Sequence, residues 1–279
     1  MFKPLMMAHI CPDFLDMQPG EFVAETKYDG ERIEVLVSTG HDDLFTDKRI
    51  TAWSRYGLER KLPTHLIEEL AKLPCGYYDG ELLVPGARSY GVKVIENASL
   101  LQYHIFDLPE LDTLMYDNRR KVLEEICRKS KIGKMVHLAR SIKVNSWSEV
   151  IDIRDDAWRQ GEEGLILKRT SGLYQCGKRS KDWLKIKNLC HAVLTVTGFV
   201  AGTSTKQNRG PFAMVRLRDD EGNVITVKTR NTFELQRFEQ DGAPDDEHPA
   251  IGRKLVILFQ ERTPDGSYRH PRWDRWENE

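Results

Sequence analysis

The spacing of apolar and polar positions divides the first two thirds of the chain into helix-like and strand-like segments. Apolar residues recur at helical spacing in residues 66–73, 114–127 and 148–160. Ser146, with Glu149 three positions later, has the spacing of a capping box at the start of the third segment. Short segments that alternate or run apolar, as strands do, occur at residues 22–24, 33–37, 80–84, 101–108 and 164–168. The pattern predicts a mixed α/β domain.

Beyond Lys187 the pattern changes to short strands separated by turns. Strand-like segments occur at residues 192–201, 213–217, 225–229 and 254–260, with a short helical segment at 232–239 and turns at 220–223 and 264–266. This content suits a small Greek-key barrel of the oligonucleotide-binding (OB) kind, although an SH3-like barrel has a similar number of strands. We therefore predict an α+β chain, with a mixed α/β domain of antiparallel sheets in residues 1–188 and an OB-fold β-barrel in residues 189–279.

Composition is typical of a globular protein, with 40% hydrophobic and 30% charged residues among 279. No apolar run approaches the roughly 20 residues of a membrane span, and the N-terminus does not have the pattern of a signal peptide. We therefore expect a cytoplasmic protein with no membrane partner. The five cysteines are scattered, with no pair at the close spacing of zinc ligands, so we expect reduced thiols and no zinc. The formal charge of −1 decides nothing about nucleic acid, because clustering of cations matters more than their sum.

The most informative segment is residues 25–32, with the sequence ETKYDGER, which lies between two predicted strands. Lys27 has the features of a nucleophile for attack on phosphorus, provided that it loses the proton that a free lysine keeps to a pKa of about 10.4. Gly30 allows close approach of the backbone to a ligand, and Arg32 offers a planar fork for phosphate or sugar oxygens. A surface ion pair on a hairpin is the alternative interpretation of this segment alone.

Five further segments carry chemically useful side chains in order along the chain. Each has an ordinary structural interpretation, as core packing for the aromatic residue and as solvated surface for the charged ones. Taken together they supply two carboxylates, several cations for phosphates and one aromatic platform for a base, in addition to the lysine. This is the composition of a nucleotidyl-transfer site. The residues are Arg55, Glu81, Phe106, Glu163 and the pair Lys185 and Lys187.

These motifs resemble, in order and spacing, those of covalent lysine nucleotidyltransferases, and most closely the ATP-dependent DNA ligases of the compact, two-domain phage type. The resemblance extends from about Pro4 to Arg275. It implies that the first domain is an adenylation (nucleotidyltransferase) domain. It also implies ATP and Mg²⁺ as cofactors, nicked double-stranded DNA as the partner, and a monomer that acts in DNA repair, replication or recombination in a bacterial or phage-infected cell.

For the nucleotide, the resemblance implies specific roles. Lys27 forms a phosphoramidate with AMP. Glu25 lies at the adenine edge and Phe106 stacks on the ring. Glu81 binds the ribose or helps to hold metal, and Glu163 is the principal metal carboxylate.

For the phosphates and the nick, the resemblance implies a second group of roles. Arg32 and Arg55 contact the sugar and the 5′-phosphate of the nick, and Asp29 lies near the 3′-hydroxyl and the metal. Lys185 and Lys187 neutralise the α-phosphate as charge develops in the transition state.

Two basic regions complete the expected site. The first is a DNA-binding loop that leads into the strand with Lys185, and consists of Lys178, Arg179 and Lys181. The second is near the C-terminus, where the family usually has arginine, any residue, aspartate and lysine to orient pyrophosphate. This chain instead reads Arg275, Trp276, Glu277 and Asn278. We expect Arg269, Arg272 and Arg275 to supply the missing charge.

The function that we predict is sealing of a 5′-phosphate to a 3′-hydroxyl at a nick in duplex DNA. An RNA ligase and an mRNA-capping guanylyltransferase, which share the lysine motif, are alternatives. A catalytically silent nucleic-acid-binding module is an alternative from a different class. The retained Lys27, Glu81 and Glu163 argue against the silent module.

Overall fold

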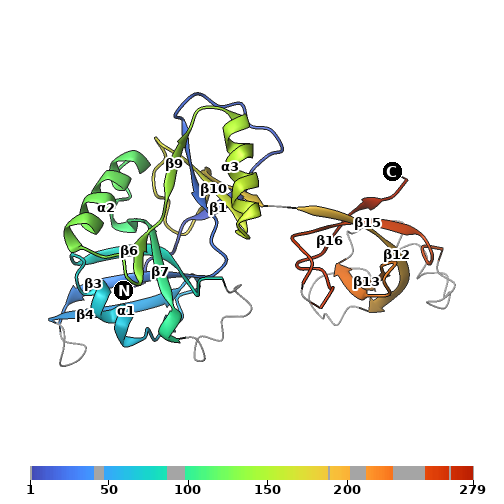
Figure 1. Ribbon diagram of the computed structural model, residues 1–279, viewed down its shortest axis with the longest axis horizontal. Helices are drawn as coiled ribbons and strands as arrows, with labels where there is room; N and C mark the ends of the chain where they lie inside the picture. The colour runs from blue at the N-terminus through green and yellow to red at the C-terminus, as the bar shows by residue number, and fades with distance from the viewer. Residues whose placement is uncertain are drawn as a thin grey trace. The chain divides into compact units, whose positions relative to one another are not determined.

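The computed structural model describes residues 2–40, 47–86, 98–187, 189–201, 212–228, 249–263 and 265–278. The chain divides into two compact units, Met1–Lys187 and Asn188–Glu279. Strands make up most of the regular structure and helices are few, as Figure 1 shows. Within these described ranges, no helix combines the length and the apolar character needed to cross a membrane.

The first unit contains a five-stranded sheet in the order β1-β11-β10-β2-β9. The helix α3 (Trp147–Arg159) packs against β2, β9 and β10 and buries apolar residues of one face of this sheet. The predicted cap is present, because the Ser146 side chain accepts the Glu149 N–H at 3.2 Å. The strands are β1 (Met7–Ile10), β2 (Phe22–Thr26), β9 (Ser141–Val144), β10 (Gly164–Arg169) and β11 (Arg179–Lys187).

The second sheet of this unit has six strands in the order β5-β4-β3-β6-β7-β8. The helices α1 (Thr64–Leu70) and α2 (Tyr116–Ser130) pack on it and enclose the largest apolar core of the described chain. The three predicted helices are confirmed, with their ends shifted by less than about one turn. The strands are β3 (Glu31–Thr39), β4 (Lys48–Ser54), β5 (Glu59–Arg60), β6 (Gly76–Leu83), β7 (Gln102–Asp107) and β8 (Val136–Leu138), with the short 3₁₀ helices η2 (Ala98–Leu100) and η3 (Pro109–Leu111).

The expectation of antiparallel sheets does not hold at two edges. β1 pairs with β11, and β7 with β8, in parallel. The reason is connectivity, since parallel neighbours need a long crossover, and here α2 joins β7 to β8. Such crossovers cannot be recognised from the apolar pattern of the strands themselves.

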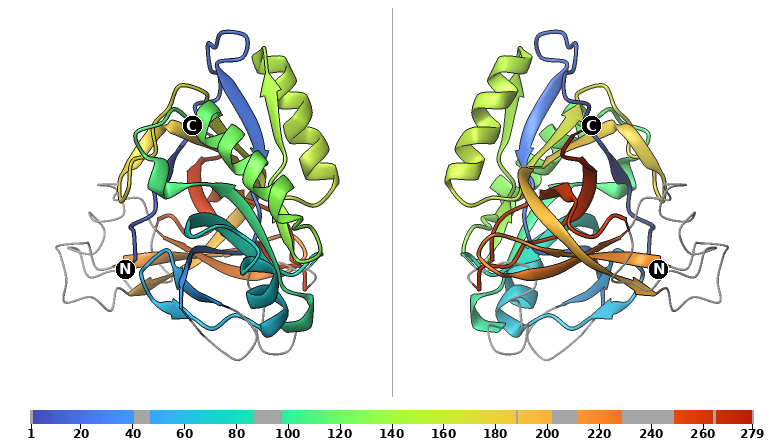
Figure 2. Two further views of the ribbon diagram at one scale, coloured as in Figure 1. Left: turned by 90° about the vertical axis from the view of Figure 1, so that its left-hand side faces the viewer. Right: turned by 90° about the vertical axis from the view of Figure 1, so that its right-hand side faces the viewer.

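The second unit is a five-stranded antiparallel sheet in the order β14-β13-β12-β15-β16, part of which is visible in Figure 2 in orange and red. Its core includes Trp273 and Trp276. The predicted strands of this region are confirmed, whereas the predicted helix at residues 232–239 lies outside the described residues. The described pairings leave β14 and β16 as edges and do not close a barrel. The strands are β12 (Cys190–Ala201), β13 (Phe212–Arg218), β14 (Val224–Lys228), β15 (Lys254–Phe259) and β16 (Arg272–Trp276).

Candidate active site

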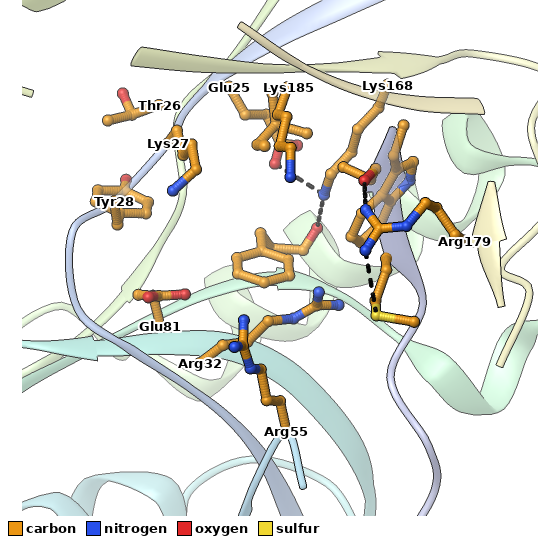
Figure 3. Close-up of a pocket in the computed structure, with 15 residues that line it drawn as sticks. Glu25, Thr26, Lys27, Tyr28, Arg32, Arg55, Glu81, Lys168, Arg179 and Lys185 are labelled. Atoms are coloured by element: carbon orange, nitrogen blue, oxygen red, sulfur yellow. Dashed lines mark hydrogen bonds and ion pairs between the residues drawn. The ribbon is translucent and has the colours of Figure 1, made fainter. Parts of the chain in front are cut away.

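A cavity of about 210 Å³ lies between the two sheets of the first unit. Its wall takes residues from β1, β2, β10 and β11 of one sheet and from β3, β6 and β7 of the other. Figure 3 shows side chains from these strands converging on it. Eight residues that were singled out from the sequence line it, namely Glu25, Lys27, Arg32, Arg55, Glu81, Phe106, Arg179 and Lys185.

Lys27 follows the last residue of β2 and is fixed at both its backbone and its side chain. Its N–H donates to the Gly164 carbonyl at 2.9 Å, and its amine forms an ion pair with Glu163. The Lys187 amine binds the other oxygen of Glu163 at 2.5 Å. Burial by itself would raise the pKa of Glu163, but the two lysines hold this pKa below its usual value. Glu163 is therefore ionised and connects Lys27 to Lys187, although neither Glu163 nor Lys187 lines the cavity itself.

Glu81 lies on β6, directly opposite Arg32 on β3. Burial raises the pKa of Glu81 to about 8, and the charges of Lys27 and Arg32 only partly oppose this effect. In the described part of the chain, its carboxyl has no hydrogen bond or ion pair. The backbone at Gly30 lies close to β6, and only glycine fits there, because a Cβ at that position would lie 2.3 Å from the Leu82 carbonyl oxygen. Glu81 thus offers the cavity a carboxyl group that can donate or accept a hydrogen bond.

Arg32 lines the cavity but is anchored behind it. Its guanidinium donates to the two Asp79 oxygens at 2.9 and 2.6 Å, and the Tyr174 hydroxyl donates to the same carboxylate at 2.7 Å. Burial tends to lower the pKa of Arg32, but Asp79 more than compensates, so the side chain stays charged. A fixed cation therefore faces the cavity.

Lys168 is the main site residue that the sequence interpretation missed. Its side chain is 1% exposed, and its amine lies 2.8 Å from a Glu25 oxygen and donates to the Phe106 carbonyl at 2.9 Å. The other Glu25 oxygen accepts the Tyr116 hydroxyl. Both oxygens of Glu25 thus have protein partners, and its expected contact with adenine stays a prediction. A lysine two positions after Ile166, on the same face of a buried strand, was the available signal.

The remaining cavity cations gather where phosphates are expected to bind. Burial lowers the pKa of Lys185, and neighbouring Arg179, Lys187 and Lys27 lower it further. Arg55 follows β4, and its N–H donates to the Arg32 carbonyl at 3.2 Å. Like charges that line one cavity repel each other unless an anion lies between them, and this repulsion disfavours the empty site. The cavity is therefore suited to a polyphosphate.

Other predicted residues lie apart from the cavity wall. Asp29 is half-buried in the loop after β2 and does not line the cavity. Within the expected DNA-binding loop, the Arg179 guanidinium donates to the Ala8 carbonyl and forms part of the wall, whereas Lys178 and Lys181 are exposed.

The three arginines expected to hold pyrophosphate belong to the second unit. Arg269 is buried and donates to Glu261 at 3.1 Å. Arg272 and Arg275 are exposed on β16, where Arg275 pairs with Asp274. Their exposure makes Arg272 and Arg275 better candidates than Arg269 for binding a mobile anion.

Residues 79–187 match the family model described as the ATP dependent DNA ligase domain. Over these residues the chain is similar to a DNA ligase domain. A DNA ligase of Enterobacteria phage T3 is 26% identical over 139 residues, which are 50% of this chain and 40% of the relative. A DNA ligase of Archaeoglobus fulgidus is 30% identical over 227 residues, which are 73% of this chain and 39% of the relative. The family resemblance of the motifs is thus confirmed, and the chain spans about 40% of the length of these curated ligases.

Solved ligase structures share the fold. A Lig E DNA ligase, from a study of DNA binding with a minimal scaffold, has a TM-score of 0.75 at 17% identity and covers 99% of this chain and 100% of its own. The ATP-dependent ligase of bacteriophage T7 in complex with ATP has a TM-score of 0.53 at 19% identity, with 98% of each chain covered. At these identities the likeness concerns the fold, which is mostly sheet with few helices.

Proposed function

We propose that the protein is an ATP-dependent DNA ligase that seals 5′-phosphate and 3′-hydroxyl ends at nicks in duplex DNA through a Lys27–AMP intermediate. The observation that carries this proposal is the placement of the Lys27 amine, paired with a carboxylate, at a cavity lined by cations from both sheets. In this proposal residues 1–188 act as the adenylation domain and residues 189–279 as an OB-fold domain.

In the first step, the Lys27 amine attacks the α-phosphorus of ATP. A nitrogen–phosphorus bond forms, the bond to the β-phosphate oxygen breaks, and its electron pair leaves with pyrophosphate. The Lys27 ammonium must lose a proton to solvent before attack, and Glu163, which contacts the ammonium and stays ionised, orients it. Lys185 and Arg32 offset the charge that builds on the α-phosphate oxygens.

The base and sugar are assigned from the shape of the cavity. Phe106 and Trp183 give it aromatic walls of the kind on which a purine stacks. Glu81, because its pKa is about 8, is largely protonated at neutral pH and can donate to a ribose oxygen.

Magnesium fits the carboxylates that the site offers. No cluster of three or more histidine, cysteine, aspartate or glutamate side chains occurs among the residues that the structure describes, so the protein provides no complete cage. Mg²⁺ usually binds through one or two carboxylates together with substrate phosphates. Glu163, which is ionised, would hold it, and Glu81 would do so only after losing its proton. When bound, the cation would withdraw negative charge from the phosphate oxygens.

In the later steps, the AMP passes from Lys27 to the 5′-phosphate of the nick, and the 3′-hydroxyl then displaces AMP. Arg55 is assigned to the 5′-phosphate and Asp29 to the region of the 3′-hydroxyl. Lys178, Arg179 and Lys181 are assigned to the DNA backbone, where positively charged side chains provide most of the non-specific affinity.

Intact-mass measurement after incubation with ATP and Mg²⁺ tests the first step. We expect a gain of one AMP in the wild-type protein and in Lys143→Ala, whose amine is exposed. We expect no gain in Lys27→Ala, which should still seal a nick that already carries AMP. An adduct of equal yield in Lys27→Ala would contradict the assignment. Labelling by GTP instead of ATP would indicate a guanylyltransferase.

A further inference from the structure

Three aromatic rings form a tilted stack beside the proposed nucleophile, with interplanar angles of 47° and 33° between successive rings. The Tyr28 ring lies 4.6 Å from the His104 ring, and the His104 ring lies 4.9 Å from the His137 ring, centroid to centroid. The three residues come from the loop after β2, from β7 and from β8. The stack therefore connects the loop between β2 and β3 to the second sheet, which contains β7 and β8.

The stack connects the neighbour of Lys27 to the neighbour of Glu81. Tyr28 follows Lys27 in the chain and lines the cavity, as Figure 3 shows. His104 lies directly opposite Glu81 in the β6–β7 pair, and His137 lies opposite His104 in the β7–β8 pair. A shift of the Tyr28 ring would thus move the nucleophile relative to the carboxyl group across the cavity.

The chemistry of the rings favours packing over proton transfer. Burial, with His137 nearby, lowers the pKa of His104 to about 4, so His104 is neutral in the physiological range. Burial, with Glu25 nearby, raises the pKa of Tyr28 to about 12. Two uncharged rings at this separation attract each other by dispersion, even though their planes are tilted by 47° for Tyr28 and His104.

The backbone contacts on either side of Tyr28 do not themselves fix the position of its ring. The Lys27 N–H is tied to Gly164 in the sheet that contains β2. Gly30, three positions later, packs closely against Leu82 of the second sheet. Between these two points, Tyr28 provides a side-chain contact with the second sheet. A displacement of the reacting groups by about 1 Å can cost about 10²-fold in rate, so this contact is placed to affect the reaction of Lys27.

We propose that His104 is a positioning residue, which holds the Tyr28 ring, and through it Lys27, at the distance from Glu81 that adenylation requires. The proposal rests on the proposed Lys27–AMP chemistry. It concerns the steps in which Lys27 reacts and not the sealing of a pre-adenylated nick, in which Lys27 forms no bond.

The test compares two single-turnover reactions in the full-length protein, Lys27 adenylation by ATP and sealing of a nick that already carries AMP. We expect His104→Ala to slow adenylation by about tenfold or more, and sealing by less than about twofold. His104→Phe, which keeps a ring, should restore adenylation to within about threefold of wild type. His65→Ala is the matched control, since His65 is also half-buried and its ring nitrogen lies 3.2 Å from the Leu101 carbonyl oxygen.

The outcomes separate the two proposals. If the wild-type protein acquires no AMP, the proposed function fails. If it acquires AMP and His104→Ala does so at the same rate, only the positioning role fails. Equal losses in both reactions, or no rescue by His104→Phe, would also overturn the positioning role. Should His104→Ala not fold, Tyr28→Leu and Tyr28→Phe provide the same comparison, with the second keeping the ring.

Discussion

Replacing Lys168 by methionine should strongly destabilise the first unit, because it leaves a buried carboxylate without its cation. Glu25 and Lys168 are 3% and 1% exposed, with 2.8 Å between the amine and the nearer oxygen. After the change, Glu25 keeps the Tyr116 hydroxyl and an Arg120 nitrogen at 3.8 Å. Removing one partner of a buried ion pair typically costs about 3–5 kcal/mol, and these remaining contacts favour the lower value of about 3 kcal/mol.

The second carboxylate near Lys168 should add little to this cost. Asp107 lies 3.8 Å from the Lys168 amine, but Arg119 donates to it at 2.7 and 3.1 Å. The loss of stability in Lys168→Met should therefore arise mainly from the unpaired Glu25 carboxylate. Combining Lys168→Met with Glu25→Gln removes both charges, and a neutral pair of similar volume should recover about 2 kcal/mol of the single-variant loss.

Urea unfolding followed by tryptophan fluorescence measures these differences, since Trp183 lies 4.3 Å from the Lys168 amine. Lys143→Met is the matched control, because Lys143 is 69% exposed and pairs loosely with Asp117 at 3.8 Å. We expect the control to change the unfolding midpoint little. The reasoning is refuted if Lys168→Met costs no more than the control, or if the double variant is as unstable as the worse single variant.

Three further predictions concern individual charges. Burial raises the pKa of Glu81 to about 8 in the folded state. The folded protein should therefore lose stability as the pH rises from the pKa that Glu81 has in the unfolded chain toward 8. Glu81→Gln should reduce the loss of unfolding free energy between pH 6 and pH 9, and an unchanged loss would contradict the raised pKa. Neutralising Lys178, Arg179 and Lys181 together should weaken nick binding and flatten its dependence on salt by about 0.9 in the log–log slope for each phosphate that is no longer neutralised. An unchanged slope would mean that these residues face solvent. Asn278→Lys should speed formation of the AMP adduct, with little effect on sealing of pre-adenylated nicks, because only the first step expels pyrophosphate. Equal rates of adduct formation in variant and wild type would show that other cations already hold the leaving group.

Much of the candidate site could be read from short segments, because the lysine motif and the later motifs each carry their chemistry within a few residues. Lys27, Arg32, Glu81, Phe106 and Lys185 all line one cavity, as their shared order suggested. The partners of these residues could not be read in the same way. Asp79 and Tyr174 hold Arg32 from segments that are distant from it in the chain, and nothing in their own sequence pattern indicates this contact.

Burial was the second property that sequence did not reveal. The spacing of Lys168 from Ile166 was a signal, but its burial became clear only from its enclosure by Glu25, Phe106 and Trp183. Arg269 is the opposite case. It was expected to bind an anion, yet its side chain is buried against Glu261.

The sequence by itself determined the local features of this protein, namely the helices and strands, the change of character after Lys187, and the position of Lys27 between two strands. These depend on residues close together in the chain, through the repeat of apolar positions and the conformational freedom of Gly30. Tertiary structure alone decided the parallel edges of the sheets, the pairing of Lys168 with Glu25 and the stack of Tyr28 on His104. Each joins segments that are distant in sequence, and its energy depends on burial and on distances that exist only after the chain has folded.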